Sequence, residues 1–337
     1  MKKVTIRDVA KAAGVSPSTV SRAFSMPGRV SPETTKRIFA VADELGYHEI
    51  PIESRPSSGH RGLIAIIVPD MANQFFTDIV RSVQQECARQ DVGLLVCESR
   101  ESASQERKAF DRAVYYADGV ILASSRMPDS MIRKCAQVKP VVVTNRIIRG
   151  VPSVVSDISD GMRQSVQHFK SLGFDRVTYL DGPAHSWSAG VCWNELTRAC
   201  ADEGLRIKRH WPGWPTYEGG YALVRDYLRS PTGAVLAYND MMALGFIAGM
   251  RKNGYECPDA YSIIGIDDDI VGKLAWPALS SICRSTRMLG AKAAQMLLSR
   301  YTGGAVEATL QSVPTRLVVR DSTGPRSQRV PKGRGVV

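Results

Sequence analysis

The stretch TIRDVAKAAGVSPSTVSR, residues 5–22, decides the architecture of the amino-terminal part of this chain of 337 residues. Its first half carries apolar residues at i, i+3, i+4 and i+7, which places them on one face of a helix. They are Ile6, Val9, Ala10 and Ala13. Thr5 suits the N-cap of this helix, and Gly14 suits its end, because glycine adopts a left-handed backbone at little cost. A first short helix is therefore predicted.

A second helix is predicted directly after this glycine. Ser16 can cap it, and Pro17 suits its first position because no amide donor is needed there. Val20 and Phe24 lie four residues apart and are expected to pack inward. The residues left facing outward are Pro17, Ser18, Ser21 and Arg22.

A third helix is predicted to start with Ser31 as cap and Pro32 as first residue and to stop at Gly46. Its inward face would hold Ile38, Val41, Ala42 and Leu45. Two helices joined by a glycine-containing turn and braced by a third make a helix-turn-helix, whose second helix enters the major groove of DNA. The alternative to DNA binding is that the three helices form a small subdomain that binds another protein.

The predicted DNA contacts follow from the outward face. Arg22 can bind guanine with two hydrogen bonds, and the hydroxyls of the second helix can reach phosphates or bases. The candidate DNA-binding residues are Thr5, Ser16, Pro17, Ser18, Thr19, Ser21, Arg22, Arg29 and Tyr47. Residues 1–61 carry ten Lys and Arg against six Asp and Glu, an excess that suits a polyanion.

Composition narrows the remaining classes. The chain is 44% hydrophobic and 23% charged, as expected for a globular protein, and its net charge is +11. The seven cysteines include no Cys-x-x-Cys pair, so neither a disulfide framework nor a metal site is expected, and no cofactor is predicted. Neither a secretory signal nor an apolar run of about 20 residues is present. A cytoplasmic protein without membrane contact is the expectation.

Beyond residue 61 the pattern changes to β-rich runs that alternate with helical ones. The runs are Leu63–Val68, Leu94–Cys97, Val120–Ala123, Val141–Thr144, Val177–Leu180, Ala234–Ala237 and Ser262–Ile266. Alternation of this kind predicts βαβ units and parallel sheets. About 260 residues exceed one open sheet, so two doubly wound α/β lobes with a cleft between them are predicted.

Several collinear motifs carry a resemblance to a known family. They lie at residues 5–16, 18–22, 30–34, 45–47, 62–69, 73–76, 238–245, 265–268, 277–282 and 314–320. On these motifs the sequence resembles the LacI/GalR family of bacterial regulators over about residues 4–322. The resemblance implies an all-α helix-turn-helix headpiece and a two-lobed α/β domain like the periplasmic binding proteins.

The resemblance also implies a division of the chain. The headpiece would span 1–46, an atypical hinge or linker 47–61, and the effector-binding and dimerisation domain 62–321. The N-lobe would comprise about 62–158 and 287–313, and the C-lobe about 159–286 and 314–321. Residues 322–337, rich in Arg, Gly and Pro, are predicted to be a basic disordered tail.

The implied function is transcription regulation, most simply repression. A homodimer, with a tetramer left open, would bind a pseudo-palindromic operator in double-stranded DNA. A small molecule, a sugar, polyol or nucleoside, would bind between the lobes and control DNA affinity. In the family a hinge helix places a leucine in the minor groove, but here Pro56 stands in that place. An extended linker that leaves DNA binding to the headpiece alone is therefore expected, and the alternative is that Ile50 or Ile52 serves as the wedge.

The predicted effector site combines position and resemblance. Aromatic rings can stack on a sugar, and carboxylates at strand ends can accept hydroxyls. Family members usually carry an arginine six residues after a serine or arginine on a helix of the second lobe. Here Ser186 fits the first place but Cys192 stands at the second, so Arg146 is the candidate cation. The candidate effector-binding residues are Phe75, Phe76, Arg146, Ser186, Trp187, Cys192, Trp214, Asn239 and Asp267.

Two other classes of function remain. One is a small-molecule receptor of the same two-lobed fold without DNA binding, and the helix-turn-helix pattern argues against it. The other is an enzyme. The sequence holds no Gly-x-Ser-x-Gly, His-Glu-x-x-His or Walker motif, and Asp267-Asp268 has no candidate nucleophile nearby in sequence. The chain is therefore not expected to be an enzyme.

Overall fold

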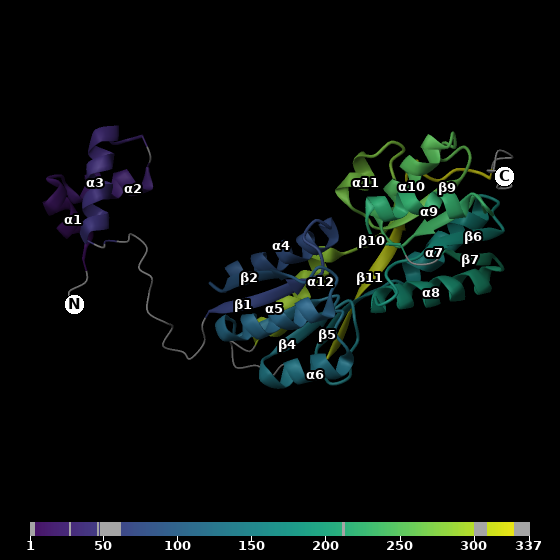
Figure 1. Ribbon diagram of the computed structural model, residues 1–337, viewed down its shortest axis with the longest axis horizontal. Coiled ribbons are helices and arrows are strands. Elements are labelled where there is room, and N and C mark those ends of the chain that lie inside the picture. The colour runs from purple at the N-terminus through teal and green to yellow at the C-terminus, as the bar shows by residue number, and fades with distance from the viewer. Residues whose placement is uncertain are drawn as a thin grey trace. The chain divides into compact units, whose positions relative to one another are not determined.

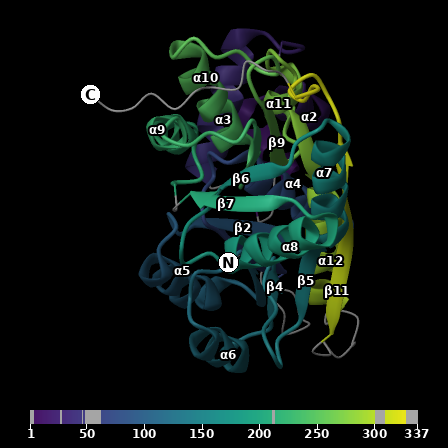
Figure 2. The same cartoon turned by 90° about the vertical axis from the view of Figure 1, so that its right-hand side faces the viewer.

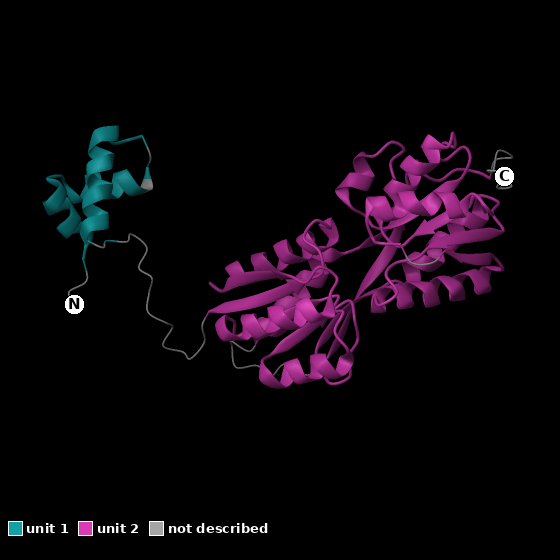
Figure 3. Cartoon of the chain, viewed as in Figure 1, with its two compact units in different colours: residues 1–59 teal, residues 60–337 magenta. Residues whose placement is uncertain are grey.

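The computed structural model describes residues 4–26, 28–45, 47, 62–210, 213–299 and 309–326. The chain divides into two compact units, Met1–Gly59 and His60–Val337 (Figure 3). The linker segment that holds Pro56 and the two candidate wedge residues lies outside the described residues.

Unit 1 is a bundle of α1 (Ile6–Ala13), α2 (Pro17–Ser25) and α3 (Pro32–Leu45). Its core consists of small and β-branched side chains from all three helices: Val9, Ala10, Ala13, Val20, Ala23, Ile38 and Ala42. The predicted inward position of Leu45 is wrong, because its side chain at the last turn of α3 is 39% exposed.

The ends of the first two helices follow the local rules. The backbone amide and the hydroxyl of Thr5 both donate to Asp8 Oδ2, at 2.8 and 2.7 Å. Gly14 ends α1 with φ 67°, in the left-handed region, and its amide donates to the carbonyl of Ala10. Ser16 caps α2 and accepts the amide of Thr19 at 3.2 Å. These caps fix the turn between α1 and α2, as the sequence predicts.

Unit 2 is a continuous sheet with helices on both faces (Figure 1). Its strands are β1 (Leu63–Val68), β2 (Gly93–Glu98), β3 (Gly119–Ala123), β4 (Val141–Thr144), β5 (Ser153–Asp157), β6 (Arg176–Leu180), β7 (Arg206–His210), β8 (Ala234–Ala237), β9 (Ser262–Asp267), β10 (Ser280–Arg284) and β11 (Leu310–Val318). Their spatial order is β2-β1-β3-β4-β5-β11-β10-β9-β8-β6-β7.

The helices of unit 2 alternate with these strands. They are α4 (Gln74–Ala88), α5 (Ala103–Tyr116), α6 (Asp129–Val138), α7 (Ser159–Ser171), α8 (Trp187–Glu203), α9 (Tyr217–Tyr227), α10 (Asp240–Lys252), α11 (Ile270–Leu274) and α12 (Thr286–Leu298). All strand pairs are parallel except β10 with β11. The mostly parallel order follows from the βαβ connections.

Four apolar layers hold the sheet and its helices together. In the N-lobe, α4 and α12 cover one face and α5 and α6 the other. In the C-lobe, α7 and α8 cover one face of β6 to β9, and α9 and α10 cover the opposite face (Figure 2). The two lobes therefore have separate cores.

The strand β11 belongs to both lobes. Its first part, Leu310 to Pro314, pairs in parallel with β5, and its second part, Thr315 to Val318, pairs antiparallel with β10. The chain also changes lobe between β5 and α7 and between β10 and α12. Three segments of the chain thus connect the two lobes.

The first residues of the predicted tail are ordered, so the expectation of disorder from residue 322 is wrong for 322–326. The hydroxyl of Ser322 donates to the carbonyl of Ile263 at 2.7 Å, and the amide of Gly324 donates to Ser262 Oγ at 3.0 Å. Arg326 pairs with Asp175 at 2.8 Å. The sequence pattern does not reveal these contacts, because the partners are 59 to 151 residues away along the chain. Residues 327–337 lie outside the described part of the chain.

Candidate functional site

The outward face of α2 carries the predicted DNA-binding residues of the recognition helix. The side chains of Pro17, Ser18 and Arg22 are exposed, and those of Thr19 and Ser21 are half-buried. Ser16 Oγ lies 2.8 Å from both the Ser18 and Thr19 hydroxyls. A guanidinium and small hydroxyl side chains on one exposed helix face fit the major groove of DNA.

The other three predicted DNA contacts flank this helix within unit 1. Thr5 is exposed at the start of α1, with its hydroxyl bound to Asp8. Arg29 is exposed in the loop after α2 and lines a hollow that reaches Phe39 of α3. Tyr47 is half-buried, and its ring meets the ring of Phe24 edge-on with centroids 5.9 Å apart. Tyr47 therefore also serves the packing of the headpiece.

The second candidate site is a cleft at the carboxyl ends of the strands of unit 2. Ser124 follows β3, Tyr238 follows β8, and Asp267 and Arg284 end β9 and β10. The cavity that the lining side chains enclose is about 20 Å³, so the cleft is nearly closed in this arrangement of the lobes. The lining comprises Asn73, Phe75, Phe76, Glu101, Ser124, Arg126, Ser188, Pro215, Tyr238, Asn239, Asp267 and Arg284. Ligands of doubly wound sheets bind at this edge.

Four of the predicted effector residues line this cleft: Phe75, Phe76, Asn239 and Asp267. Asn239 caps α10, where its Oδ1 accepts the amide of Met242 at 2.9 Å, and its amide group donates to the carbonyl of Pro215. Phe75 and Phe76 are both nearly buried, and their rings meet edge to face. The aromatic pair thus packs in the core and borders the cleft at once.

Two further predicted residues stand one layer behind the lining. Ser186 caps α8, and its hydroxyl lies 3.1 Å from the Tyr238 hydroxyl. Cys192 is fully buried, and burial raises the pKa of its thiol. Both touch a lining side chain, so they shape the cleft through Tyr238 and Arg284.

Arg146, Trp187 and Trp214 lie outside the cleft lining. The guanidinium of Arg146 is turned to the loop after β3, where it donates to the carbonyls of Ser125 and Met127 at 2.9 and 2.7 Å and pairs with Asp129. The Trp187 side chain is half-buried on α8, and that of Trp214 is 70% exposed. The prediction that Arg146 supplies the cation of the cleft is therefore corrected.

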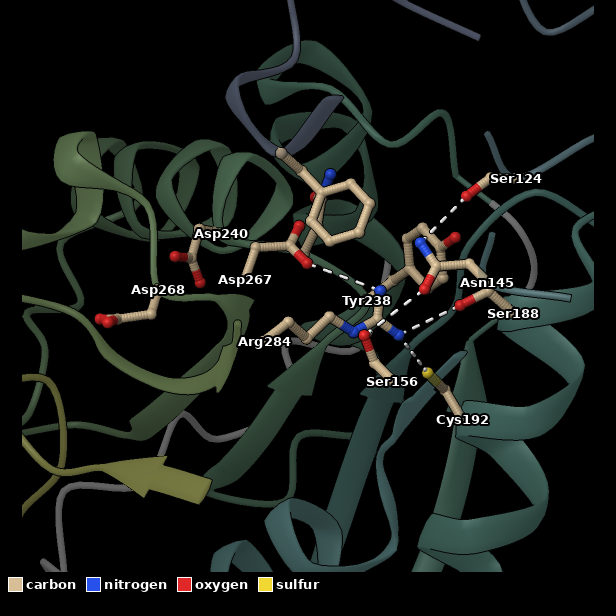
Figure 4. A network of polar contacts seen from close by, with 12 residues as sticks. Ser124, Asn145, Ser156, Ser188, Cys192, Tyr238, Asp240, Asp267, Asp268 and Arg284 are labelled. Carbon is tan, nitrogen blue, oxygen red and sulfur yellow. Dashed lines mark hydrogen bonds and ion pairs between the residues drawn. The ribbon is translucent and has the colours of Figure 1, made fainter. Parts of the chain in front are cut away.

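The cation comes instead from Arg284, which sequence analysis missed (Figure 4). Its side chain is only 7% exposed, and Nη1 lies 3.6 Å from Asp267 Oδ1. Nη2 donates to Ser188 Oγ at 3.1 Å and to Cys192 Sγ at 3.5 Å. The guanidinium also stands over the Phe75 ring, 5.5 Å from its centroid. The sequence signal that could have identified Arg284 is a charged residue at the end of the buried strand 280–284.

A second ion pair lies across the cleft. Arg126 Nε donates to Glu101 at 2.6 Å, and its Nη1 donates to the carbonyl of Ser124. The buried carboxylate of Glu106 accepts the amide of Arg126 at 2.8 Å and so fixes the loop. Burial raises the pKa of Asp267 well above its usual range, while the nearby Arg284 opposes that rise. Each guanidinium of the lining thus has a carboxylate partner.

The side chains that line the cleft suit the binding of a small molecule. Within the described ranges, no three His, Cys, Asp or Glu side chains are grouped so that they could hold a metal ion. No helix in the same ranges is long and apolar enough to cross a membrane. The seven cysteines are all described, and all are free.

Comparison with known proteins gives two domain matches. Residues 5–49 match the model "Bacterial regulatory proteins, lacI family", and residues 166–323 match the periplasmic binding protein-like domain. The HTH-type transcriptional repressor CytR of Escherichia coli is 28% identical and covers 95% of this chain and 96% of its own. The relatives that are 26 to 28% identical to this chain over 95% or more of its length are regulators of transcription, not enzymes.

Solved structures agree with these matches. The transcriptional regulator CelR in complex with cellobiose is 26% identical, with a TM-score of 0.70 over 95% of this chain and 100% of that one. The Lac repressor dimer bound to operator and the anti-inducer ONPF has a TM-score of 0.72 at 24% identity over 96% and 100%. At 24% identity, the likeness to the Lac repressor dimer shows the fold alone.

Proposed function

The chain belongs to the lacI family of bacterial regulatory proteins and is a DNA-binding transcription regulator, and we propose that it is a repressor whose operator affinity is set by a small molecule in the cleft of unit 2. The observation that carries this proposal is the joint presence of an exposed recognition face on α2 and a polar cleft with buried charges at the strand ends. A regulator that reads DNA works where the chromosome lies, so its place is the bacterial cytoplasm.

On the DNA side, we propose that Arg22 contacts a base edge and that the neighbouring hydroxyls contact phosphates or bases. The exposure of Pro17, Ser18 and Arg22 supports this assignment. Thr5, Arg29 and Tyr47 are proposed to contact the sugar-phosphate backbone beside the groove.

We further propose that the protein acts as a homodimer on a pseudo-palindromic operator. The support is an apolar patch on and after α11, where Ile270, Val271, Leu274 and Trp276 are 48, 40, 79 and 81% exposed. Large exposed apolar side chains that cluster on one segment are typical of a protein interface. A second copy of the chain would bury them.

Coupling between the sites is proposed to run through the three connections between the lobes. An effector that binds better to one lobe arrangement shifts the population toward it, and a DNA site that prefers the other arrangement is then bound less well. Linkage of this kind commonly changes affinity by 5- to 150-fold, about 1–3 kcal/mol. The solved structure of the regulator CelR is a complex with cellobiose, which supports a carbohydrate as the class of effector.

The test is selection of DNA by the purified full chain. Sheared genomic DNA is incubated with the protein, and bound fragments are sequenced. We expect enrichment of fragments that share a two-fold related motif, and a metabolite that lowers their retention at least fivefold. Retention of all fragments in proportion to their abundance would refute the proposed function.

A further inference from the structure

Arg284 and Asp267 meet in the effector cleft although neither has its bonding capacity filled. Their closest atoms are 3.6 Å apart, which is longer than a hydrogen bond. Asp267 Oδ1 and Arg284 Nε are both buried, and neither has a hydrogen-bond partner among the described residues. The two side chains are 5 and 7% exposed. Leaving such groups unpaired costs free energy, so the pair is suited to a ligand that supplies the missing bonds.

The two atoms make opposite demands on that ligand. An Asp267 carboxylate that the adjacent Arg284 guanidinium keeps ionised only accepts hydrogen bonds, and the guanidinium only donates them. A hydroxyl does both, so a hydroxyl or a pair of neighbouring hydroxyls can satisfy both atoms. A ligand ammonium group would suit Asp267 alone, and a ligand carboxylate or phosphate would suit Arg284 alone.

The charges that line the cleft also favour an uncharged ligand. Its lining holds two guanidiniums and two carboxylates, and the pairs are Arg126 with Glu101 and Arg284 with Asp267. An anionic ligand would therefore bring an uncompensated negative charge beside the buried Asp267 and the partly buried Glu101. An uncharged ligand leaves both pairs intact.

The position of the guanidinium differs from the one that the family resemblance implies. The resemblance places an arginine on α8 where Cys192 stands, and here Arg284 reaches Cys192 Sγ from the neighbouring strand β10. The side-chain hydroxyl of Ser188 and the Phe75 ring hold the guanidinium from two further sides. Its planar donors are thus fixed before a ligand arrives.

We propose that Arg284, together with Asp267, determines effector specificity and selects an uncharged polyol over its anionic counterparts. This inference rests on the proposed function, because it concerns the effector site of the same regulator. The ligand class includes sugars and nucleosides and excludes sugar phosphates, sugar acids and nucleotides.

The first experiment uses the full chain and matched probe pairs. Calorimetric titration and thermal shift compare ribose with ribose 5-phosphate, glucose with gluconate, cellobiose with cellobionate, and cytidine and adenosine with their 5′-monophosphates. We expect the uncharged member of at least one pair to bind, and its partner to bind at least tenfold more weakly. Binding confined to anionic members, or no binding by any uncharged member, would overturn the inference.

The second experiment changes the guanidinium. Arg284→Gln removes the charge and leaves the buried Asp267 carboxylate without a cation, whereas Arg284→Lys keeps a cation beside Asp267 but loses the planar fork. The lysine variant is the second test in case the glutamine variant does not fold. We expect the best uncharged probe to bind at least tenfold more weakly to both variants. The matched control is Arg229→Gln, which breaks an exposed pair with Asp226 on the surface. Wild-type probe affinity in Arg284→Lys or in a folded Arg284→Gln would refute the role of Arg284.

The outcomes separate the two proposals. Selection of genomic fragments by the wild-type protein tests the repressor function without any effector. If the protein selects fragments but prefers anionic probes, only the specificity inference fails. If it selects no fragments, the proposed function fails whatever the probes do.

Discussion

The guanidinium of Arg284 and the sulfur of Cys192 lie 3.5 Å apart, in van der Waals and weak hydrogen-bond contact at the base of the effector cleft. The cysteine is fully buried beneath the arginine, and burial raises the pKa of its thiol. A thiol with a raised pKa and no access to solvent reacts slowly with electrophiles.

We therefore expect Cys192 to resist alkylation in the native protein. Iodoacetamide at pH 7.5, followed by mass spectrometry, should modify Cys97 and Cys283, which are partly exposed, well before Cys192. The same treatment in urea is the control, and it should label all three. Rapid native labelling of Cys192 would mean that the cleft opens far more than this packing allows.

Arg22→Ala should weaken operator binding by about 1–3 kcal/mol per half-site and relax sequence preference at one base pair. The reason is that an exposed guanidinium on α2 can make two hydrogen bonds to one guanine. The measurement is a binding profile over a randomised operator. Arg37→Ala, an exposed arginine on α3, serves as the control and should leave the base preferences unchanged.

Gly14→Ala should destabilise the headpiece by about 1–2 kcal/mol, because φ 67° is unfavourable for a residue with a Cβ atom. The cost is backbone strain alone, since no other atom lies within 4 Å of a Cβ built there. Gly14→Asn should cost less, because asparagine tolerates this backbone. Amide hydrogen exchange over α1 and α2 of the full chain measures the change; equal exchange in both variants would contradict the assignment to strain.

Burial raises the pKa of Asp269 to about 6 from an ordinary value of 3.8, with nearby Asp78 and Asp268 adding to the rise. A raised carboxyl pKa means that the folded state disfavours the charge, so this residue costs stability increasingly as pH rises from about 4 to about 6. The cost at pH 7 is at most about 3 kcal/mol.

Asp269→Asn should therefore gain stability over the wild type at pH 7 and little at pH 4. Urea unfolding at the two pH values gives the difference directly. Asp91→Asn, at an exposed turn, is the matched control. A difference between Asp269→Asn and wild type that does not change with pH would show that the carboxyl titrates normally.

Trp276→Glu should raise the dissociation constant of the dimer at least tenfold, because it places a charge in the apolar patch after α11. Light scattering over a dilution series measures the dissociation. Tyr115→Glu is the control, because Tyr115 is 73% exposed on α5, away from that patch in sequence and in lobe. Unchanged dimerisation in Trp276→Glu would move the interface elsewhere.

The sequence predicted those elements whose apolar pattern is strong. The buried runs Leu63–Val68, Val141–Thr144 and Ala234–Ala237 are strands with the predicted bounds. The apolar pattern does not predict β7, because this strand pairs only with β6 at the edge of the sheet and its sequence RIKRH contains three Arg or Lys residues and one apolar residue. Edge strands often lack the apolar signal.

The effector cleft shows a similar limit. Asp267 and Phe75 could be proposed from strand ends and from the resemblance, because both depend on local position. Arg284 could not be connected to Asp267 by spacing, because only the parallel register of β9 and β10, which pairs Cys283 with Asp267, brings the two side chains together. Arg146 is a cation just after a strand, as the prediction required, but the loop carbonyls of Ser125 and Met127 that bind it have no pattern in the sequence.

The strand shared by the lobes has a mechanical consequence. Pro314, which has no amide hydrogen to donate, is the last residue of β11 that pairs with β5, and Thr315 is the first that pairs with β10. Torsion of one lobe against the other can be absorbed there without breaking ladder bonds in either core. Substituting a residue that donates a hydrogen bond at this pivot would stiffen it, and the signal from metabolite to operator would weaken even though both binding surfaces stay intact.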